Sequence, residues 1–174
     1  EESASDDKAV AHVQVVPADA LVKPGEQIEY TVRTFNAAGQ LLGETDGAAF
    51  SADANGTFAD STFTASADVA HVATNITAQL GSLTGTARVR IIPDLPWSFD
   101  FDGLTSPPVS WVGARYRHII REVDGSNAMV KITTIPKGAR SRSWMGYSNL
   151  SNYTITADIQ GARTNDKMPD IGLI

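Results

Sequence analysis

Hydrophobic and polar residues alternate along most of the chain with the period of two that is typical of β-strands. The strictest case is residues 28–33, Ile-Glu-Tyr-Thr-Val-Arg, which predicts a strand with one buried face. Turn residues such as Pro24-Gly25 and Gly39 separate such runs at intervals of about 8–12 residues, the spacing of a β-sandwich. Further strands are expected at 13–15, 41–42, 49–52, 56–64, 69–80 and 84–92. We therefore predict an immunoglobulin-like sandwich of about seven strands.

The second half of the chain opens with another alternating run. Residues 97–102, Trp-Ser-Phe-Asp-Phe-Asp, predict a strand with an aromatic core face and a polar outer face. Asp124-Gly125 predicts a hairpin turn. Other strands are expected at 111–115, 116–122, 128–134, 143–147, 153–160 and 171–174. Because the last run is apolar and reaches Ile174, we expect this second β-domain to be incomplete.

Composition divides the chain into segments. Residues 1–9 are acidic and lack periodicity, which indicates a flexible linker before a first sandwich at 10–93. Two prolines in Pro93-Asp-Leu-Pro96 cannot continue a central strand, so 94–96 form a Pro-rich linker. The second β-domain then covers 97–174. The whole fold class is all-β.

The first domain carries an ordered set of turn and strand motifs that resembles a bacterial immunoglobulin-like module of the group 2 type. These motifs are Val13-Gln-Val-Val-Pro17, Leu21-Val-Lys-Pro-Gly25-Glu, Tyr30-Thr-Val-Arg-Thr-Phe-Asn36-Ala-Ala-Gly39 and Gly85-Thr-Ala-Arg-Val-Arg90-Ile-Ile-Pro93. The resemblance covers about residues 10 to 93. It implies a spacer or adhesive role.

The second domain resembles the opening part of a jelly-roll domain of the concanavalin or laminin-G-like type. The motifs are Leu95-Pro-Trp-Ser-Phe-Asp-Phe-Asp102, Pro107-Pro-Val-Ser-Trp111-Val, Glu122-Val-Asp-Gly125, Met145-Gly146, Asn152-Tyr-Thr-Ile-Thr-Ala-Asp158 and Lys167-Met-Pro-Asp-Ile-Gly-Leu173. With the preceding module, the set is similar to the C-terminal region of bacterial, planctomycete-type proteins with PQQ-like β-propeller repeats. This resemblance implies a secreted, periplasmic or cell-surface protein whose propeller lies upstream and whose remaining jelly-roll strands lie downstream.

Charge and composition exclude several classes of partner. The chain has a net charge of −6, and residues 1–93 hold 12 acidic against 5 basic residues, whereas the remainder holds 8 against 9. An acidic first domain argues against nucleic acid, which requires concentrated Lys and Arg. No apolar stretch approaches the ~20 residues of a membrane span. The chain has no Cys, which removes disulfides and thiolate chemistry.

Aromatic residues of the second domain are the best candidates for ligand contact, because flat rings stack on sugar faces while nearby polar groups bind hydroxyls. The candidate contact residues for a glycan or cell-surface polymer are Trp111, Trp144, Tyr147, Arg140, Arg142 and Asn149. The alternative is that a ring such as Trp144 belongs to the core, since a sandwich needs large residues inside. The segment 137–142 is basic and could grip an acidic polysaccharide, although a solvated loop is the alternative.

Carboxylates offer a second candidate site. Asp100 and Asp102 lie two residues apart and share one strand face, so with Asp158 or Asp124 they could hold a structural calcium ion. The alternative is that they are solvent-facing residues opposite the aromatic face. No other cofactor is expected. A glycosidase needs two carboxyl groups that flank the scissile bond, and no motif marks such a pair, so we expect no enzyme.

The three histidines fall in separate expected strands, and we interpret His12, His71 and His118 as surface or edge residues. The sequence thus favours a non-catalytic binding and spacer module pair of an exported bacterial protein. A structural protein that pairs through β-edges with other chains is the first alternative. An accessory domain of a larger PQQ-type or hydrolytic enzyme is the second.

Overall fold

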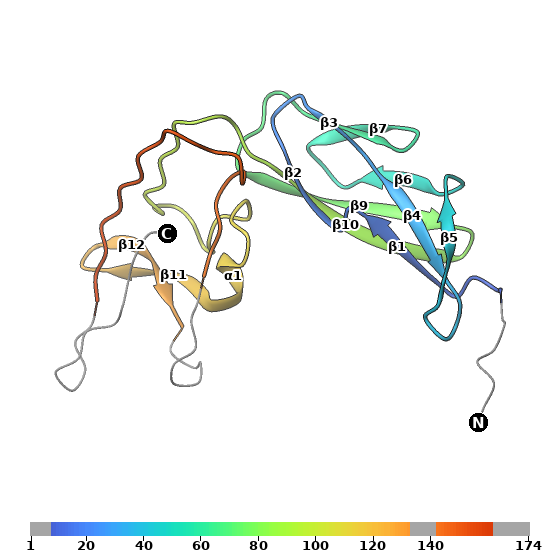
Figure 1. The fold of residues 1–174 in the computed structure, drawn as a ribbon. Helices are drawn as coiled ribbons and strands as arrows, with labels where there is room; N and C mark the ends of the chain where they lie inside the picture. Colours follow the sequence, from blue (N-terminus) through green and yellow to red (C-terminus); the bar gives the residue numbers. More distant parts are fainter. Residues whose placement is uncertain (1–7, 133–141, 162–174) are drawn as a thin grey trace.

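The computed structural model describes residues 8–132 and 142–161, and within them the chain is nearly all β. The strands are β1 (His12–Val16), β2 (Asp19–Val22), β3 (Gln27–Glu29), β4 (Thr31–Phe35), β5 (Leu41–Thr45), β6 (Ala49–Ala52), β7 (Gly56–Ala59), β8 (Thr62–Ala65), β9 (Val72–Leu80), β10 (Leu83–Ile91), β11 (His118–Val123) and β12 (Ser126–Lys131). A short helix, α1 (Ala114–Arg117), precedes β11. Figure 1 shows β1 to β10 as one body, with the rest of the described chain at one end of it.

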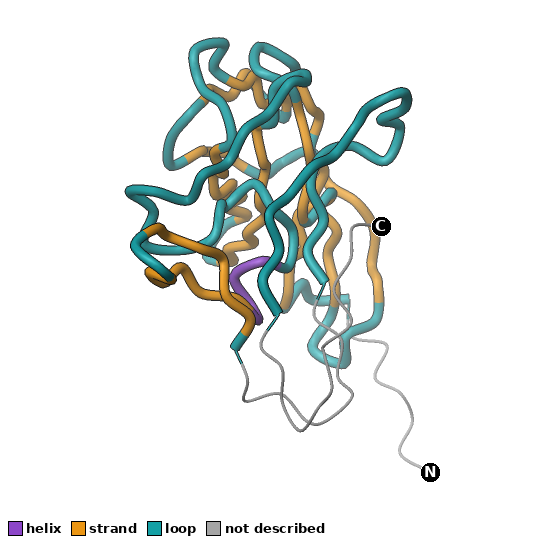
Figure 2. The backbone as a smooth tube through the Cα atoms, turned by 90° about the vertical axis from the view of Figure 1, so that its left-hand side faces the viewer, coloured by secondary structure: helices purple, strands orange, loops and turns teal. Residues whose placement is uncertain are grey.

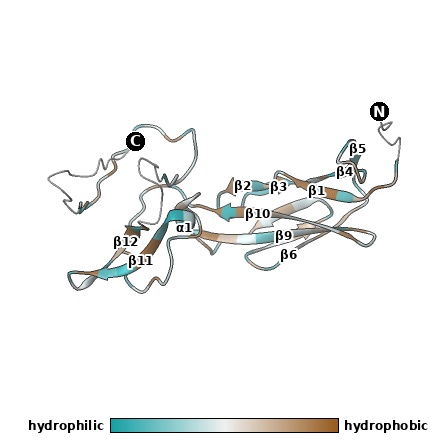
Figure 3. Cartoon of the chain, turned by 90° about the horizontal axis from the view of Figure 1, so that it is seen from below, coloured by the Kyte–Doolittle hydropathy of each residue, from teal (hydrophilic) through white to brown (hydrophobic). Residues whose placement is uncertain are grey.

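The first ten strands form a β-sandwich, which confirms the predicted all-β sandwich. Their sheets have the orders β1-β4-β5, β2-β10-β9-β6 and β3-β8-β7. Figure 3 shows β9 and β6 as a layer beneath β1, β4 and β5. The neighbouring strand segments β1 and β2 join different sheets: β1 pairs antiparallel with β4, and β2 pairs parallel with β10.

Residues 28–33 alternate in burial as predicted, yet they are not one strand. Ile28 in β3 pairs with Phe63, whereas Val32 in β4 pairs with Val15 in another sheet. Tyr30 stands between the two strands, with its backbone N–H donating to the Ser61 carbonyl at 2.9 Å. The chain therefore changes sheets at Tyr30 while its apolar side chains keep facing the same core.

The main hydrophobic cluster lies within the sandwich. Its buried residues are Val15, Val22, Tyr30, Val32, Phe63, Ala65, Ile76, Ala78, Ala87, Val89 and Ile91. Four aromatic rings meet at one end of this cluster, and the Phe50 and Phe58 rings stack with centroids 5.4 Å apart. Tyr30 and Phe63 lie within 6.0 Å of the Phe58 ring. Aromatic and aliphatic burial of this kind is the main source of stability in a small sandwich.

The predicted strand at 97–102 is absent, although its pattern of burial is correct. Trp97, Phe99 and Phe101 are half-buried, and the polar residues between them are exposed. The segment nevertheless pairs with no described strand, and Phe101 adopts a left-handed φ of 62°. The alternation predicted which side chains turn inward, but it did not show that a partner strand would be available.

The remainder of the second half is mostly loop. The hairpin at Asp124-Gly125 is confirmed, since it joins β11 to β12. The expected strand at 111–115 is wrong: Val112 makes one bridge to Trp144, and α1 follows. That bridge is also the only strand-like pairing within 143–147, and the described part of 153–160 forms no strand. Residues 171–174 lie outside the described residues. Figure 2 shows the resulting long loops around the helix and hairpin.

Side chains from both halves hold the described residues of the second half, 97–132 and 142–161, against the sandwich. The Tyr147 hydroxyl donates to the Ile92 carbonyl at 2.9 Å. The His71 ring packs edge-on against Trp97 and Phe99, with centroid distances of 5.5 and 4.8 Å. His71 is therefore a half-buried junction residue rather than a surface histidine. Within the described ranges, no helix is long and apolar enough to span a membrane.

Candidate functional site

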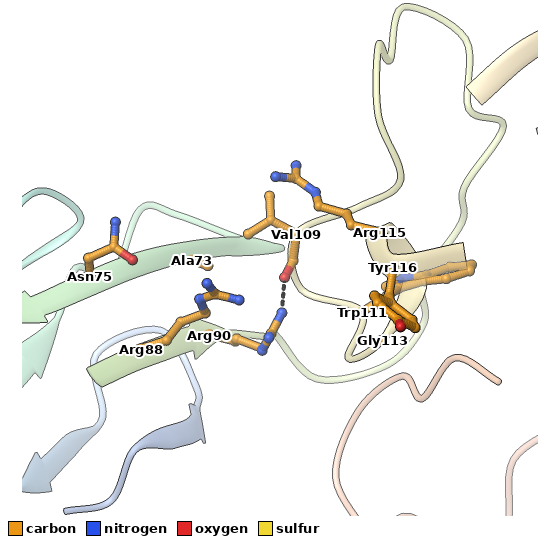
Figure 4. Close-up of a pocket in the computed structure, with 9 residues that line it drawn as sticks. All are labelled: Ala73, Asn75, Arg88, Arg90, Val109, Trp111, Gly113, Arg115 and Tyr116. Atoms are coloured by element: carbon orange, nitrogen blue, oxygen red, sulfur yellow. Dashed lines mark hydrogen bonds between the residues drawn. The ribbon is translucent and has the colours of Figure 1, made fainter. Parts of the chain in front are cut away.

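A hollow of about 620 Å³ lies where the sandwich meets the second half. Figure 4 shows side chains from β9 and β10 on one side of it and the segment 109–116 on the other. The described residues that line it are Ala73, Asn75, Arg88, Arg90, Val109, Trp111, Gly113, Arg115 and Tyr116. We refer to this site as the junction hollow.

The floor of the junction hollow is the outer face of the β9–β10 pair. Side chains alternate along β10, so Val89 and Ile91 enter the core while Arg88 and Arg90 point outward. Antiparallel pairing places Asn75 of β9 opposite Arg88. The same alternation that builds the core thus places two arginines side by side on the outside.

Arg90 is held in place by its neighbours. It is only 5% exposed, and its Nε and Nη2 donate to the two carboxylate oxygens of Asp19 at 3.0 and 2.8 Å. Its Nη1 donates to the Val109 carbonyl, which links the sandwich to the second half. A buried guanidinium needs such partners because an unpaired buried charge is costly. The charge of Arg90 is therefore offset within the protein.

The other two arginines are accessible. Arg115 uses only its Nε, which donates to the Pro107 carbonyl at 2.9 Å, so both terminal nitrogens remain available among the described contacts. The Arg88 side chain has no hydrogen-bond or ion-pair partner among the residues that the structure describes. Both side chains are exposed. The junction hollow is consequently lined by two guanidinium groups whose N–H donors are available to a ligand.

Aromatic rings form the remaining wall. The Trp111 ring packs edge-on against Phe99 and Phe101, with centroid distances of 5.0 and 5.9 Å. These two rings partly hold Trp111 in place. Its indole Nε1 is buried and has no partner within the described ranges. Tyr116 is 78% exposed, and the Arg117 guanidinium lies over its ring at 5.2 Å. Tyr116 is the more exposed ring, with Arg117 over one of its faces, whereas Trp111 packs partly against Phe99 and Phe101.

The predicted aromatic contacts do not converge. Trp111 lines the junction hollow. Trp144 is 56% exposed rather than part of the core, and a Cβ at Gly113 would lie 3.8 Å from its ring, which places Trp144 beside the hollow. The Tyr147 hydroxyl donates a hydrogen bond to the Ile92 carbonyl, and burial raises the pKa of Tyr147 to about 12. Tyr147 therefore serves the junction and not the hollow.

The predicted polar contacts lie elsewhere. Arg142 and Asn149 are exposed and are not among the described residues that line the hollow. Arg140 lies outside the described residues. The arginines found in the hollow are thus different from those predicted in the basic segment 137–142.

The carboxylates proposed for calcium do not gather into one group. No cluster of three or more metal-ligating residues exists in the described ranges 8–132 and 142–161. Asp100 accepts the Asp102 backbone N–H at 3.1 Å, and Asp102 accepts the Asn127 backbone N–H at 3.1 Å. Asp158 is exposed on a separate loop segment. These bonds give Asp100 and Asp102 local structural roles, and calcium binding stays a prediction.

A second hollow of about 500 Å³ adjoins the first along the outer face of β10. It is lined by Ala18, Asp19, Asn75, Thr86, Ala87 and Arg88. Because Asn75 and Arg88 line both hollows, the two hollows adjoin at these residues.

Sequence reasoning missed Arg88, Arg115 and Tyr116. Arg88 and Arg90 did carry a signal, since they are two of only five basic residues among the first 93 and share a strand face. The fold and the hollow together define an all-β sandwich protein with a cationic surface site. No family model matches the sequence, and a search of curated proteins also finds no match.

Proposed function

We propose that this chain is a non-catalytic, glycan-binding and spacer module of an exported bacterial protein. The observation that carries the proposal is the junction hollow, which the accessible residues Arg88 and Arg115 line together with Trp111 and Tyr116. Aromatic rings supply stacking surface for sugars, and a few convergent polar groups fix orientation. This combination is suited to holding a sugar at the surface.

The lining of the hollow favours binding over cleavage. Among its described residues there is no carboxylate, histidine, serine or threonine. Glycoside hydrolysis ordinarily uses two carboxyl groups on opposite sides of the bond. Asp19, in the adjoining hollow, is already engaged by Arg90. A binding role therefore requires fewer assumptions than a hydrolytic one.

We further propose a fold family for each half of the chain. We interpret the sandwich as immunoglobulin-like, because β1 and β2 join different sheets around one core. The second half would be a partial jelly-roll, and the parent protein would carry a PQQ-like propeller. The sequence resemblance of both halves supports these two assignments.

A glycan array with the full chain tests the proposed function. Binding should weaken in Tyr116→Ala, which removes the exposed ring of the hollow. Tyr153→Ala is the matched control, since Tyr153 is 54% exposed and does not line the hollow. Failure of the chain to bind any glycan would contradict the proposal, as would equal loss in both variants.

A structural or assembly function is the second candidate, favoured by the edge strand β5. Leu41 and Leu42 on this strand are 58% and 37% exposed, and β5 ends its sheet. An exposed edge with apolar side chains can pair with another chain. Light scattering after size exclusion should then show association that Leu41→Lys abolishes. A monomer at high concentration would remove this candidate.

A further inference from the structure

We propose that the junction hollow selects acidic polysaccharides, and that Arg88 and Arg115 bind the ring carboxylates of uronic acid residues. This inference rests on the proposed glycan-binding function and names the class of glycan. Its basis is the juxtaposition of two accessible guanidinium groups, one from β10 and one from α1, across a single hollow (Figure 4).

The charge of the hollow is opposite to that of the protein. The chain carries −6 overall, whereas the described lining of the hollow holds three arginines and no acidic residue. Asp19 offsets Arg90, which leaves the charges of Arg88 and Arg115 uncompensated there. A small cationic site on an acidic surface attracts anions locally and repels them elsewhere.

Guanidinium groups suit a carboxylate better than a hydroxyl. Their planar forks donate two parallel hydrogen bonds to a carboxylate, which adds strength and orientation. The Arg115 guanidinium group is already oriented, because its Nε donates a hydrogen bond to the Pro107 carbonyl. Less side-chain freedom is then lost when its terminal nitrogens bind a ligand.

The adjoining hollow indicates a ligand longer than one sugar. The two hollows share Arg88 and Asn75, so a chain could continue from the junction over Thr86 along β10, past the Asp19 carboxylate, whose charge Arg90 offsets. Asn75 donates its backbone N–H and its Nδ2 to Asp53 at 3.0 and 2.8 Å. Its Oδ1 remains as an acceptor for a sugar hydroxyl.

The rings and the overall charge favour a glycan over other polyanions. The exposed ring of Tyr116 offers a pyranose the face that Arg117 does not cover, and an acidic peptide has no equivalent flat face. Nucleic acid would bring many phosphates against an acidic sandwich with only two accessible arginines in the hollow.

The test compares polygalacturonate with its fully methyl-esterified form, which has the same backbone without the carboxylate charge. The full chain should bind polygalacturonate at least about 10-fold more tightly, because charged hydrogen bonds are lost on esterification. Arg88→Gln and Arg115→Gln should each weaken binding to polygalacturonate by about 10-fold. Arg121→Gln is the matched control, since this exposed arginine lies on β11 outside the hollow.

The outcomes separate the two proposals. Equal binding of both polymers would overturn the carboxylate inference and leave glycan binding intact, whereas binding of neither, with a blank glycan array, would remove both. Tighter binding of poly-glutamate or of a sulfated polysaccharide than of polygalacturonate would also overturn the inference. An equal loss in Arg121→Gln would show that the hollow is not the site. The comparison of the two polymers uses the unaltered chain, so it tests the role of the carboxylates even if a variant fails to fold.

Discussion

Arg90 and Asp19 form a bidentate ion pair, in which a buried guanidinium binds a carboxylate on the neighbouring parallel strand. The pair has an asymmetric exposure, with the Arg90 side chain 6% and the Asp19 side chain 44% exposed. Arg90 also reaches the Val109 carbonyl, so the pair stands between the sandwich core and the second half. Its loss should affect both.

Replacement of Asp19 by Ala should lower the free energy of unfolding by about 2 kcal/mol, because it leaves a buried guanidinium without its carboxylate. Denaturant unfolding measures the change. Glu44→Ala is the matched control: it breaks the exposed Arg33–Glu44 pair, whose side chains are 43% and 54% exposed. That variant should lose less than about 1 kcal/mol. Similar losses in the two variants would contradict the assigned role of Arg90.

The strands of the sandwich could be predicted largely from the sequence because they alternate and are bounded by turn residues. Most of their pairings could not, since β1 pairs with β4, β2 with β10, β3 with β8 and β6 with β9. Residues 49–52 form β6 with the predicted bounds, and 84–92 closely match β10. The change of sheets at Tyr30 could not be predicted. Alternation of hydrophobic and polar residues indicates which side chains are buried, but it does not indicate which strand pairs with the segment. The same reason explains the missing strand at 97–102.

The candidate site was harder to predict than the fold. Trp111 was identified from its residue type, but Arg88 and Arg115 come from different halves and meet only through the packing at the junction. Tyr147 was assigned to ligand contact for its ring, whereas its hydroxyl ties the halves together. Residue type indicates what a side chain can do, and tertiary contacts decide which of these roles it has.

Tyr147→Phe should loosen the junction without unfolding the sandwich. The variant removes one hydrogen bond to the Ile92 carbonyl, worth about 1 kcal/mol. We expect faster proteolysis within residues 97–132 and 142–161 and a nearly unchanged main unfolding transition. Tyr116→Phe is the control, because its exposed hydroxyl has no such partner among the described residues. Unchanged proteolysis in Tyr147→Phe would contradict the role of this contact.

Mild acid should also loosen the junction, through His71. Burial among aromatic rings lowers its pKa from the usual 6.5. Because the folded pKa lies below the unfolded value, the stabilising contribution is fully present above about pH 6.5 and is lost as pH falls through the folded pKa. The emission of Trp97, whose ring is 5.5 Å away, should shift to the red below pH 6.5.

His71→Asn provides the control for this titration. Asn tolerates the left-handed φ of 53° at this position and does not titrate. The acid-dependent shift of tryptophan emission should therefore be absent in the variant. An identical pH dependence in the variant would assign the effect to another group.

Alkaline pH should destabilise the sandwich through Tyr30. Burial, assisted by the negative charge of Asp19, raises the pKa of Tyr30 from 10.0 to about 12. A raised folded pKa means that stability is full below about pH 10 and falls as pH rises toward 12. Denaturant midpoints at pH 9 and pH 11 measure this loss.

Tyr30→Phe should remove most of that alkaline loss, because the raised pKa of Tyr30 is its cause. At neutral pH the variant should be as stable as the unaltered chain or more so by about 1 kcal/mol, since the Tyr30 hydroxyl is buried without a partner in the described part of the chain. A large loss of stability at neutral pH would show that this hydroxyl has a partner.

Gly56→Ala should disrupt the aromatic end of the core. A Cβ at Gly56 would lie 2.5 Å from the Thr64 carbonyl oxygen and would collide with the fully buried ring of Phe63. Neither the backbone of β8 nor this ring can move freely, so we expect a loss of about 1–3 kcal/mol in denaturant unfolding. Gly47→Ala is the control, because the nearest atom to its Cβ, Oγ1 of Thr45, is 3.5 Å away. That substitution should change stability by less than about 1 kcal/mol, and an equal loss in both variants would mean that backbone freedom, not the contact with Phe63, requires glycine at position 56.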